Sequence, residues 1–568
     1  MQKQKPSRPL SNNKNGWRMR SKYRTRLAAR ARRKSQGSSL RAGLAVIGGR
    51  TAGALSRRLH IGGGTSIVGI VAQGLYPDIL GYLAAQLEHG NIVITGTNGK
   101  TTTCGIVGSV LNSAGMRVWR NREGSNLVRG IAGSLVIRAL PNGQLRGQGE
   151  AISILEVDEA VMPIIVPETH PRVAVFNNLF RDQLDRYGEV DSVMTRWRKA
   201  IASMSPDATL VLNADDPSTA VLGENFTGKI IYYGIEDPSL DLSQQPNNSS
   251  ERHQVIDTRA CPHCGSEYEY TLRFYSHMGH YRCPNCDFAR PQTTVRAIKI
   301  QSEGFDRTRV QVDTGNGEIQ EMVIPLPGIY NVYNALSAAA TAQALDLEWK
   351  AVAEGVKQFQ PAFGRGETVE VEGRTIRLLL AKNPTGFNEV LRTLFSEDIK
   401  RNVMFVLNDN TADGKDISWI WDVDFERAAG MTNSLTLAGT RALDLGVRMK
   451  YAGVSAEGMS IVPTAPLRAL KQEHPTPSNA RGRGTHAQTE AEKAAVVADV
   501  PLATETLDKP TIEAQRLYGL DKALDEAIRQ TPVGEDLFIV PTYTALMEVH
   551  RKLEQRGLAS HYWEGKDA

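Results

Sequence analysis

A glycine-rich loop at Thr95–Thr103 (Thr-Gly-Thr-Asn-Gly-Lys-Thr-Thr-Thr) is the clearest chemical signal in the sequence. It follows a run of apolar residues that resembles a strand and precedes an apolar helical pattern. Glycines let backbone N–H groups turn toward phosphate oxygens at the start of a helix. The Lys100 ammonium can then contact the β- and γ-phosphates, and a hydroxyl at Thr101 or Thr102 can bind Mg²⁺. The residues expected to hold a nucleotide are Gly96, Thr97, Asn98, Gly99, Lys100, Thr101 and Thr102.

The first glycine of this loop comes two residues later than in the usual phosphate-binding loop, since Ile94 stands where that glycine would be. A turn that only connects a strand to a helix is the alternative. The Gly-Lys-Thr-Thr string in a strand–loop–helix context favours nucleotide binding.

Four of the five cysteines have the spacing of metal ligands. They form two Cys-x-x-Cys pairs separated by eighteen residues: Cys261, Cys264, Cys283 and Cys286. Four thiolates from two such turns suit tetrahedral Zn²⁺, and four protein ligands leave no open position, so this site should be structural. Two disulfides or a redox pair are the alternatives, and the symmetrical spacing favours zinc. His263, His277 and His280, which lie within this segment, are expected at the surface.

A turn rich in acidic residues, with Asp413, Asp416 and Asp422, follows a predicted strand that ends near Leu407. In an open α/β sheet such a loop lies at the carboxyl ends of the strands, where ligands bind. An ionised aspartate there can orient an amine or ammonia, or help to hold Mg²⁺ and nucleotide. An Asp-Gly turn and a helix cap at Ser418 explain one or two of the acids but not all three. The turn 382–389 also follows a strand and could face the nucleotide.

These loops need parallel sheets to position them. Buried strands are predicted at 91–95, 151–155, 171–176, 208–212, 375–380, 402–407 and 537–540. Helical patterns separate them, which predicts an α/β fold with parallel sheets. We predict a basic tail at 1–40, a central ATP-binding domain at 41–366 with a cysteine-bearing insert at 257–293, and a C-terminal domain at 367–568 with a mobile insertion at about 466–511.

The composition excludes several classes of protein. Of 568 residues, 41% are hydrophobic and 23% charged, which is typical of globular domains. No apolar run is long enough for a transmembrane helix, and residues 1–40 lack the apolar core of a secretory signal. Seventeen Lys or Arg and no acid precede Asp78, so the remainder holds 67 − 17 = 50 basic and 62 acidic residues, a net charge of −12. We interpret the basic segment as a solvated tail, and an electrostatic tether to anionic lipid or nucleic acid is the alternative. We expect a cytoplasmic protein, at most peripheral at the inner face of the membrane, with no specific nucleic acid partner.

The glycine-rich loop and several later segments resemble the Mur ligase superfamily, in the same order along the chain. Glu156 stands where these ligases place a Mg²⁺-binding glutamate, and Asn331 matches the asparagine that reads adenine. The segment 177–188 resembles Asn-x-x-x-Asp-His-Leu-Asp, but Gln183 stands where the metal-binding histidine is usual, which puts a second metal site in doubt. Phe363-Gly-Arg365 resembles the hinge before the C-terminal domain.

This resemblance implies ATP, Mg²⁺ and an acyl phosphate that an amine attacks. It also implies a Mur ligase-like central ATP-binding domain, here with an inserted zinc ribbon, followed by a Rossmann-like C-terminal α/β domain.

The cysteine insert, the turn 382–389 and the motif 413–422 narrow the resemblance to the MurT-type synthetase subunits of lipid II isoglutaminyl synthase. That family amidates the α-carboxylate of D-glutamate in the lipid II stem peptide, with ammonia from a separate glutaminase subunit, GatD. The resemblance maps the catalytic aspartate to Asp413, with Asp416 as the alternative, and adds Glu156 through the metal.

Two observations from the residues agree with this family. Glutamine hydrolysis needs an activated cysteine, and the fifth cysteine, Cys104, falls on the helix of the nucleotide loop. About 50 residues between the tail and the loop are too few for the UDP-binding domain of typical Mur ligases, so a lipid-linked substrate fits better. An amino-acid-adding ligase similar to folylpolyglutamate synthase is the alternative enzyme. A nucleic-acid-binding protein is the alternative from another class, and the acidic body counts against it.

Overall fold

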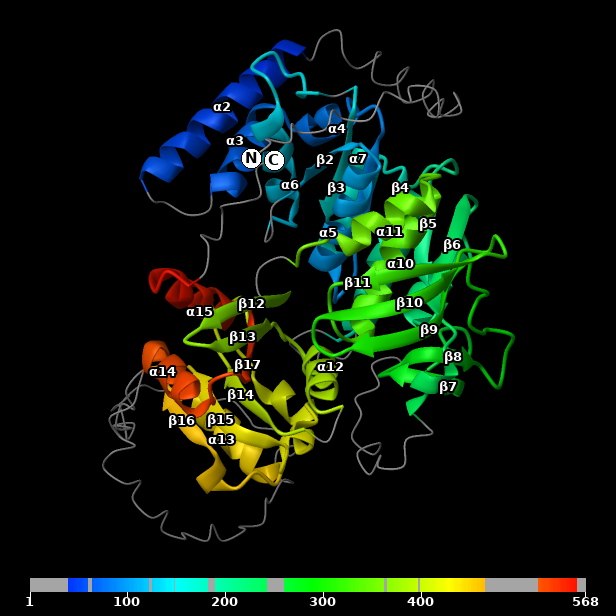
Figure 1. Ribbon diagram of the computed structural model, residues 1–568. Coiled ribbons are helices and arrows are strands. Elements are labelled where there is room, and N and C mark those ends of the chain that lie inside the picture. Colours follow the sequence, from blue (N-terminus) through cyan, green and yellow to red (C-terminus); the bar gives the residue numbers. More distant parts are fainter. Residues whose placement is uncertain are drawn as a thin grey trace, which may run out of the picture.

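The computed structural model describes residues 39–59, 64–121, 125–147, 149–181, 189–242, 260–361, 365–396, 399–464 and 519–558. Two separate α/β bodies are visible in Figure 1, each built on its own sheet. The predicted tail up to residue 38, the predicted insertion at about 466–511 and Gln183 lie outside the described residues.

The first sheet has nine strands in the order β11-β10-β9-β6-β5-β4-β1-β3-β2. Its strands are β1 (Asn91–Thr95), β2 (Arg117–Arg120), β3 (Ala151–Glu156), β4 (Val173–Phe176), β5 (Thr209–Asn213), β6 (Lys229–Ile235), β9 (Val295–Glu303), β10 (Arg307–Asp313) and β11 (Ile319–Ile324). Strands β1 to β6 and β9 run parallel, while β10 and β11 extend the sheet antiparallel. Every residue of β1, β3, β4 and β5 is buried, as expected for parallel strands covered on both faces.

Helices cover both faces of this sheet, because successive side chains of a strand point to opposite sides. Ile92 and Ile94 join the core on one face and Val93 joins the core on the other. The first face carries α5 (Lys100–Ser113), α10 (Ile329–Ala344) and α11 (Trp349–Lys357). The second carries α2 (Ser39–Arg58), α3 (Gly64–Leu75), α4 (Ile79–Ala84), α6 (Val128–Arg138), α7 (Met162–Thr169) and α8 (Glu189–Ala202).

The second sheet has six strands in the order β12-β13-β17-β14-β15-β16. Its strands are β12 (Arg365–Val371), β13 (Arg374–Leu379), β14 (Arg401–Val406), β15 (Thr432–Gly439), β16 (Ser460–Pro463) and β17 (Asp536–Pro541). All but β12 run parallel. The helices are α12 (Pro384–Leu394), α13 (Ala442–Tyr451), α14 (Leu520–Gln530) and α15 (Tyr543–Gln555), packed in two cores on the two faces. The predicted α/β fold class is confirmed.

A small hairpin, β7 (Glu269–Tyr275) and β8 (Met278–Arg282), forms a sheet of its own beside the first body. The two cysteine pairs flank it in the sequence, one before β7 and one after β8. Among the described helices, none combines the length and the apolar content that crossing a membrane requires.

Candidate active site

The glycine-rich loop lies between the end of β1 and the start of α5, at the carboxyl edge of the first sheet. Gly99 has φ of +79°, and a Cβ there would lie 2.1 Å from Asn334 Oδ1, so only glycine fits this position. Asn178 holds the loop from the side: Asn98 N donates to Asn178 Oδ1 at 2.9 Å, and Asn178 Nδ2 donates back to Asn98 O at 3.1 Å. The loop is therefore preorganised around its backbone N–H groups.

Thr101 and Glu156 meet directly behind this loop. Thr101 Oγ1 donates to Glu156 Oε1 at 3.0 Å, and both residues are buried. Glu156 ends β3, which runs parallel to β1 with Glu156 opposite Ile94, so the two strand ends bring the pair together. A hydroxyl and a carboxylate beside a phosphate loop are the oxygen ligands that Mg²⁺ prefers. The residues present therefore fit the divalent cation of a nucleotide complex.

The Lys100 ammonium folds back onto its own loop. Lys100 Nζ donates to Gly96 O at 2.5 Å and pairs with Glu159 Oε1 at 2.6 Å. Glu159 was missed from the sequence, although an acid three residues after Glu156 was a usable signal. A phosphate that reaches Lys100 has to share the ammonium with Glu159.

Asn331 lies in the first turn of α10, which packs against α5. Its Nδ2 donates to Pro327 O at 2.7 Å, and its Oδ1 accepts from Asn334 Nδ2 at 3.1 Å. Asn334 Oδ1 in turn accepts from Thr103 Oγ1 at 3.2 Å. A chain of hydrogen bonds thus connects Asn331 to the helix that follows the glycine-rich loop.

The second body reaches the glycine-rich loop through Asn383. Asn383 Nδ2 donates to Asn98 Oδ1 at 3.0 Å, across 285 residues of sequence. Asn383 follows β13 and caps α12, since its Oδ1 accepts from Gly386 N at 2.8 Å. The carboxyl edge of the second sheet therefore faces the carboxyl edge of the first, and the turn 382–389 lies at that junction.

Asp413 and Asp416 have opposite surroundings in the loop after β14. Asp413 is buried: its Oδ1 accepts from Thr544 N at 2.8 Å and its Oδ2 from Thr544 Oγ1. Burial raises the pKa of Asp413, and the hydrogen bonds from Thr544 oppose that shift. Asp416 is exposed, and a hydrogen bond from the Ser418 N–H lowers the pKa of its carboxyl. Thr544, at the start of α15, was missed from the sequence.

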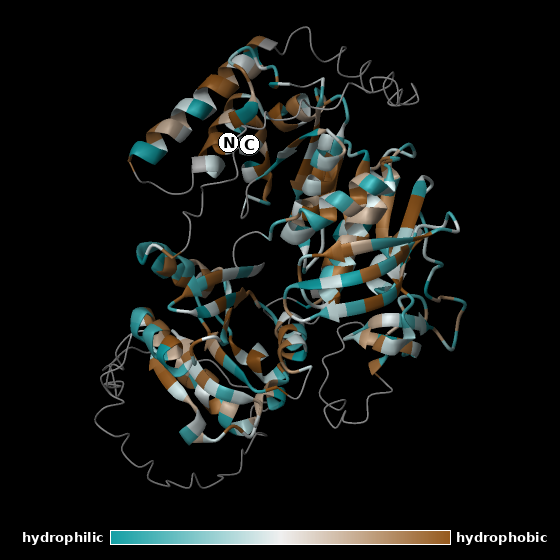
Figure 2. Ribbon diagram, in the orientation of Figure 1, coloured by the Kyte–Doolittle hydropathy of each residue, from teal (hydrophilic) through white to brown (hydrophobic). Residues whose placement is uncertain are grey.

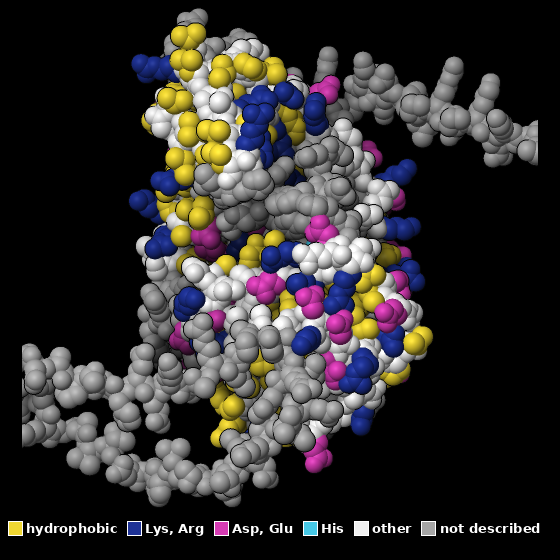
Figure 3. Space-filling model, turned by 90° about the vertical axis from the view of Figure 1, so that its left-hand side faces the viewer, with side chains coloured by type: hydrophobic (Ala, Val, Ile, Leu, Met, Phe, Trp, Pro, Cys, Tyr) yellow, Lys and Arg dark blue, Asp and Glu magenta, His cyan; other side chains and the backbone are white. Residues whose placement is uncertain are grey.

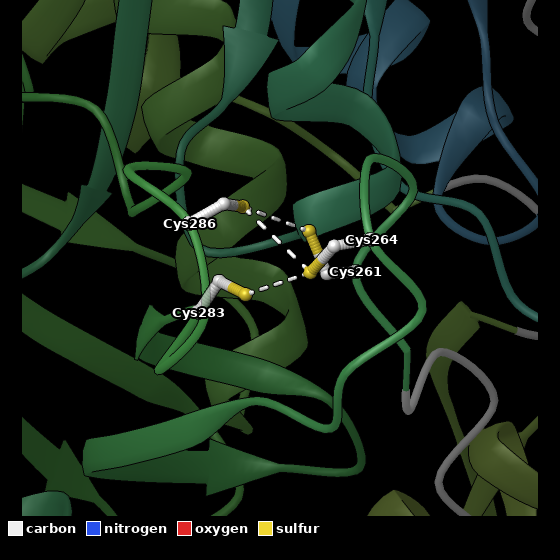
Figure 4. A group of neighbouring side chains, drawn as sticks. All are labelled: Cys261, Cys264, Cys283 and Cys286. Atoms are coloured by element: carbon white, nitrogen blue, oxygen red, sulfur yellow. Dashed lines mark hydrogen bonds between the residues drawn. The ribbon is translucent and has the colours of Figure 1, made fainter.

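The four cysteine sulfurs converge on one point (Figure 4). They all lie within 4.8 Å of one another, with separations of 3.5 Å for Cys261–Cys286, 3.4 Å for Cys264–Cys283 and 3.9 Å for Cys264–Cys286. Tetrahedral Zn²⁺ with Zn–S distances of about 2.3 Å requires sulfurs about 3.8 Å apart. The geometry fits a closed metal site.

The cysteine hairpin is anchored on two aspartates that follow β5. His277 is fully buried, with Nε2 3.3 Å from Asp216 Oδ1, so the expectation that the histidines of this segment are surface residues was wrong for His277. Arg290 Nε pairs with Asp215 Oδ1 at 2.6 Å. Asp216 Oδ2 also accepts from Leu179 N at 2.7 Å. The hairpin is thereby tied to the segment that begins at Asn177, next to the glycine-rich loop.

A small pocket lies between this hairpin and α12, with Tyr275 and Ser276 on one wall and Glu389 and Arg392 on the other. Arg392 reaches from α12 to the hairpin, since one guanidinium nitrogen donates to Phe274 O at 3.1 Å. The other nitrogen pairs with Glu389 Oε2 of the same helix at 2.5 Å. Burial raises the pKa of Glu389, and Arg392 opposes that shift. Helix α12 therefore contacts the glycine-rich loop at its start and the cysteine hairpin farther along.

Comparison with known families identifies two regions of this chain. The family described as Mur ligase middle domain matches residues 94–286, and the family described as MurT ligase C-terminal matches residues 380–480. Among curated proteins, the subunit MurT of lipid II isoglutaminyl synthase (glutamine-hydrolyzing) from Staphylococcus aureus (strain COL) is 34% identical over 394 residues. That match covers 69% of this chain and 84% of the relative. The subunit of the same name from Streptococcus pneumoniae is 32% identical over 420 residues, 74% of this chain and 89% of the relative.

Solved structures share the fold at low identity. A pseudomurein peptide ligase type C from Methanothermus fervidus has a TM-score of 0.55 at 20% identity and covers 84% of this chain and 81% of that one. The MurF ligase from Thermotoga maritima in complex with ADP has a TM-score of 0.51 at 12% identity, covering 87% and 86%. At these identities the likeness extends to the fold alone.

Proposed function

Because the chain belongs to the MurT family of lipid II isoglutaminyl synthase subunits, we propose that it is the synthetase that amidates the α-carboxylate of D-glutamate in the lipid II stem peptide. The observation that carries this proposal is the contact between Asn383 and Asn98. It places the MurT-type C-terminal body directly on the phosphate loop, where a carboxylate and ATP have to meet. The product is the D-isoglutamine form of the stem peptide, an intermediate of peptidoglycan synthesis.

The chain's own residues bind and orient the reactants in this proposal. The N–H groups of the glycine-rich loop and the Lys100 ammonium hold the phosphates, while Thr101 and Glu156 hold Mg²⁺. The carboxylate attacks the γ-phosphorus of ATP, which releases ADP and gives an acyl phosphate. Ammonia then displaces inorganic phosphate and loses a proton to leave the amide. Asn383 and α12 close the junction from the other side and exclude water, which would hydrolyse the activated carboxylate. Asn331 lies on the adenine side of the loop in this assignment.

We assign the handling of the incoming nitrogen to the loop after β14. Asp413, held rigidly by Thr544, is our first choice for orienting ammonia, and the exposed, ionised Asp416 is the alternative. Asp413→Asn and Asp416→Asn separate the two, because asparagine preserves the accepting oxygen that bonds Thr544 N or Ser418 N. Loss of ammonium-driven amidation in only one variant identifies the acid.

The four cysteines would hold Zn²⁺ in a purely structural role, since they complete its coordination and leave no open position. Bound there, Zn²⁺ would hold the two cysteine turns together, while His277 and Arg290 hold this segment on Asp216 and Asp215. One zinc per chain by elemental analysis, lost in Cys283→Ser and retained in Cys104→Ala, is the expected result. Zinc retained by Cys283→Ser would contradict it.

Ammonia has to come from another chain in this proposal. Glutamine hydrolysis needs a reactive cysteine, and outside the cysteine cluster the sequence holds only Cys104, which is 2% exposed on α5. We propose a GatD-type glutaminase as the partner subunit.

The division of the chain near residue 366 remains a prediction, supported by the change from one sheet to the other between β11 and β12.

The test is ATP-dependent amidation of purified lipid II, followed by mass spectrometry. We expect activity with ammonium chloride alone, and with glutamine only after a glutaminase subunit is added. Lys100→Ala serves as the inactive control. ADP release driven by free amino acids, with none driven by ammonium, would contradict the proposal and favour a ligase similar to folylpolyglutamate synthase.

A further inference from the structure

Helix α2 carries its large aliphatic side chains on the outside. Leu40, Leu44, Ile47 and Leu55 are 80%, 57%, 48% and 57% exposed. These positions recur at spacings of three, four and eight residues, so they lie on one side of the helix. From Leu40 to Leu55 the apolar stripe is about 22 Å long at about 1.5 Å per residue.

The buried side of α2 consists of small residues. Ala42, Ala45 and Val46 are fully buried. A Cβ at Gly43 would lie 2.6 Å from Pro141 O, and one at Gly49 would lie 2.8 Å from Val68 O, so the helix backbone packs very close to its neighbours. The usual arrangement, with large apolar residues inside, is inverted on this helix. The core of this body is therefore complete without the outer stripe.

The stripe continues onto the neighbouring helix. Leu75 of α3 is 54% exposed and lies next to α2, since a Cβ at Gly48 would lie 2.6 Å from Leu75 Cδ1. Figure 3 shows this face of the molecule, where hydrophobic side chains gather along α2 with basic side chains beside them. Figure 2 shows the same helix alternating between apolar and polar residues. Contiguous apolar surface of this kind marks an interaction site.

The charged residues of α2 itself have a single sign. Arg41, Arg57 and Arg58 of α2 are exposed. No Asp or Glu precedes Asp78, although seventeen Lys or Arg residues do. An apolar helix face flanked by basic residues is typical of a helix that lies in the plane of an anionic membrane surface. A second copy of this chain would bring a second set of arginines against the first, so like charges disfavour that occupant.

We propose that the outer face of α2 docks on an anionic lipid surface, with Leu40, Leu44, Ile47 and Leu55 at the level of the headgroups. The helix lies on the membrane, in keeping with the finding that no described helix is able to span it. The inference rests on the proposed function for the reason to dock, because lipid II is a lipid-linked substrate. For the surface itself it rests on α2 and on Leu75 of α3.

The test is binding of the purified full-length protein to vesicles, by co-sedimentation. We expect binding to vesicles of phosphatidylglycerol and phosphatidylcholine, and weak binding to phosphatidylcholine alone. The double variant Leu44→Asp, Ile47→Asp should bind the anionic vesicles at least about tenfold more weakly, because two apolar anchors become anions. The matched control, Ile319→Asp, Val533→Asp, changes two other exposed apolar residues in the same way and should bind like wild type.

A salt series distinguishes vesicle binding by the apolar stripe from vesicle binding by the basic tail. Between about 0.1 M and about 0.5 M NaCl, attraction to the tail is screened, while contact of the apolar stripe with lipid persists. Equal binding of the Leu44→Asp, Ile47→Asp variant and wild type at high salt would overturn the proposal. So would a loss of self-association or of glutaminase binding in that variant with vesicle binding unchanged, since a protein would then cover the stripe.

Activity on a water-soluble, short-chain lipid II analogue separates this inference from the proposed function. The variant should amidate the analogue at the wild-type rate, but act more slowly on lipid II in vesicles. Reduced activity on the analogue as well would overturn the docking role. If wild type bound vesicles but amidated neither substrate, the proposed function would fail and the docking surface would stand.

Discussion

At the scale of single residues, the charge of Glu156 distinguishes a metal-binding role from a structural one. Glu156→Gln keeps an oxygen that accepts from Thr101, so the fold should be unaffected, but it removes the negative charge that attracts Mg²⁺. We expect the rate of amidation to fall on the order of 100-fold, with a higher requirement for Mg²⁺. Initial rates across a magnesium series measure this. An unchanged melting temperature with an unchanged magnesium requirement would contradict the assignment.

Glu389 predicts a pH dependence of stability. Burial raises its folded-state pKa above the ordinary value of 4.5, so the folded protein binds this proton more tightly than the unfolded chain does. Stability contributed by the protonated group is therefore lost as pH rises from about 4.5 through the raised pKa. The melting temperature of Glu389→Gln relative to wild type should increase over that range.

The control for this prediction is a carboxyl with the opposite shift. Arg309 and Arg307 lower the pKa of Glu303 at the surface, so Glu303→Gln should change stability only slightly and in the opposite sense. The melting temperature of Glu389→Gln relative to wild type could instead fall as pH rises. That result would show that Arg392 keeps Glu389 ionised in the folded state.

At the scale of elements, α12 connects the two bodies, and the side chain of Asn383 at its start makes two separate hydrogen bonds. Its Oδ1 caps the helix and its Nδ2 bonds Asn98. Asn383→Ser keeps a cap but cannot reach Asn98, whereas Asn383→Ala loses both. We expect both variants to lower amidation about tenfold, and only Asn383→Ala to lower the free energy of unfolding, by about 1 kcal/mol. Denaturant titration and kcat measure the two effects. Full activity in Asn383→Ser would show that the contact is dispensable.

At the scale of the whole molecule, two sheets with separate cores meet at facing edges, so the nucleotide should couple their unfolding. Without ligand we expect two calorimetric transitions. A non-hydrolysable ATP analogue with Mg²⁺, at about 100 times its Kd, should stabilise the first body by about 2.7 kcal/mol. Because α12 contacts the glycine-rich loop, the midpoint temperature of the second transition should rise as well. In Asn383→Ser the second transition should stay in place. Movement of both transitions in that variant would contradict coupling through Asn98.

The prediction of the fold came from local patterns. Buried strands such as β1 and β3 are short apolar runs bounded by turns, and burial on both faces leaves them recognisable without tertiary information. The glycine-rich loop and the cysteine pairs are equally local, because the ligand-binding groups of each lie within a few residues of one another.

Contacts between residues far apart in the sequence could not be predicted from local sequence patterns. Asn383 meets Asn98 over 285 residues, Thr544 holds Asp413 over 131, and His277 is buried against Asp216. Each depends on which strands lie side by side in a sheet, and the order of strands is set by the packing of whole helices.

The sequence alone predicted the chemical features of this protein: a glycine-rich loop typical of phosphate binding, a four-cysteine cluster with the spacing of a metal site, and segments that resemble the MurT family. Those features are properties of residue type and close spacing. Tertiary packing sets the pairing of Lys100 with Glu159, the burial of Asp413 beside an exposed Asp416, and the outward orientation of the leucines of α2. Burial and long-range contact depend on what covers each residue, and that is settled only when distant segments pack together.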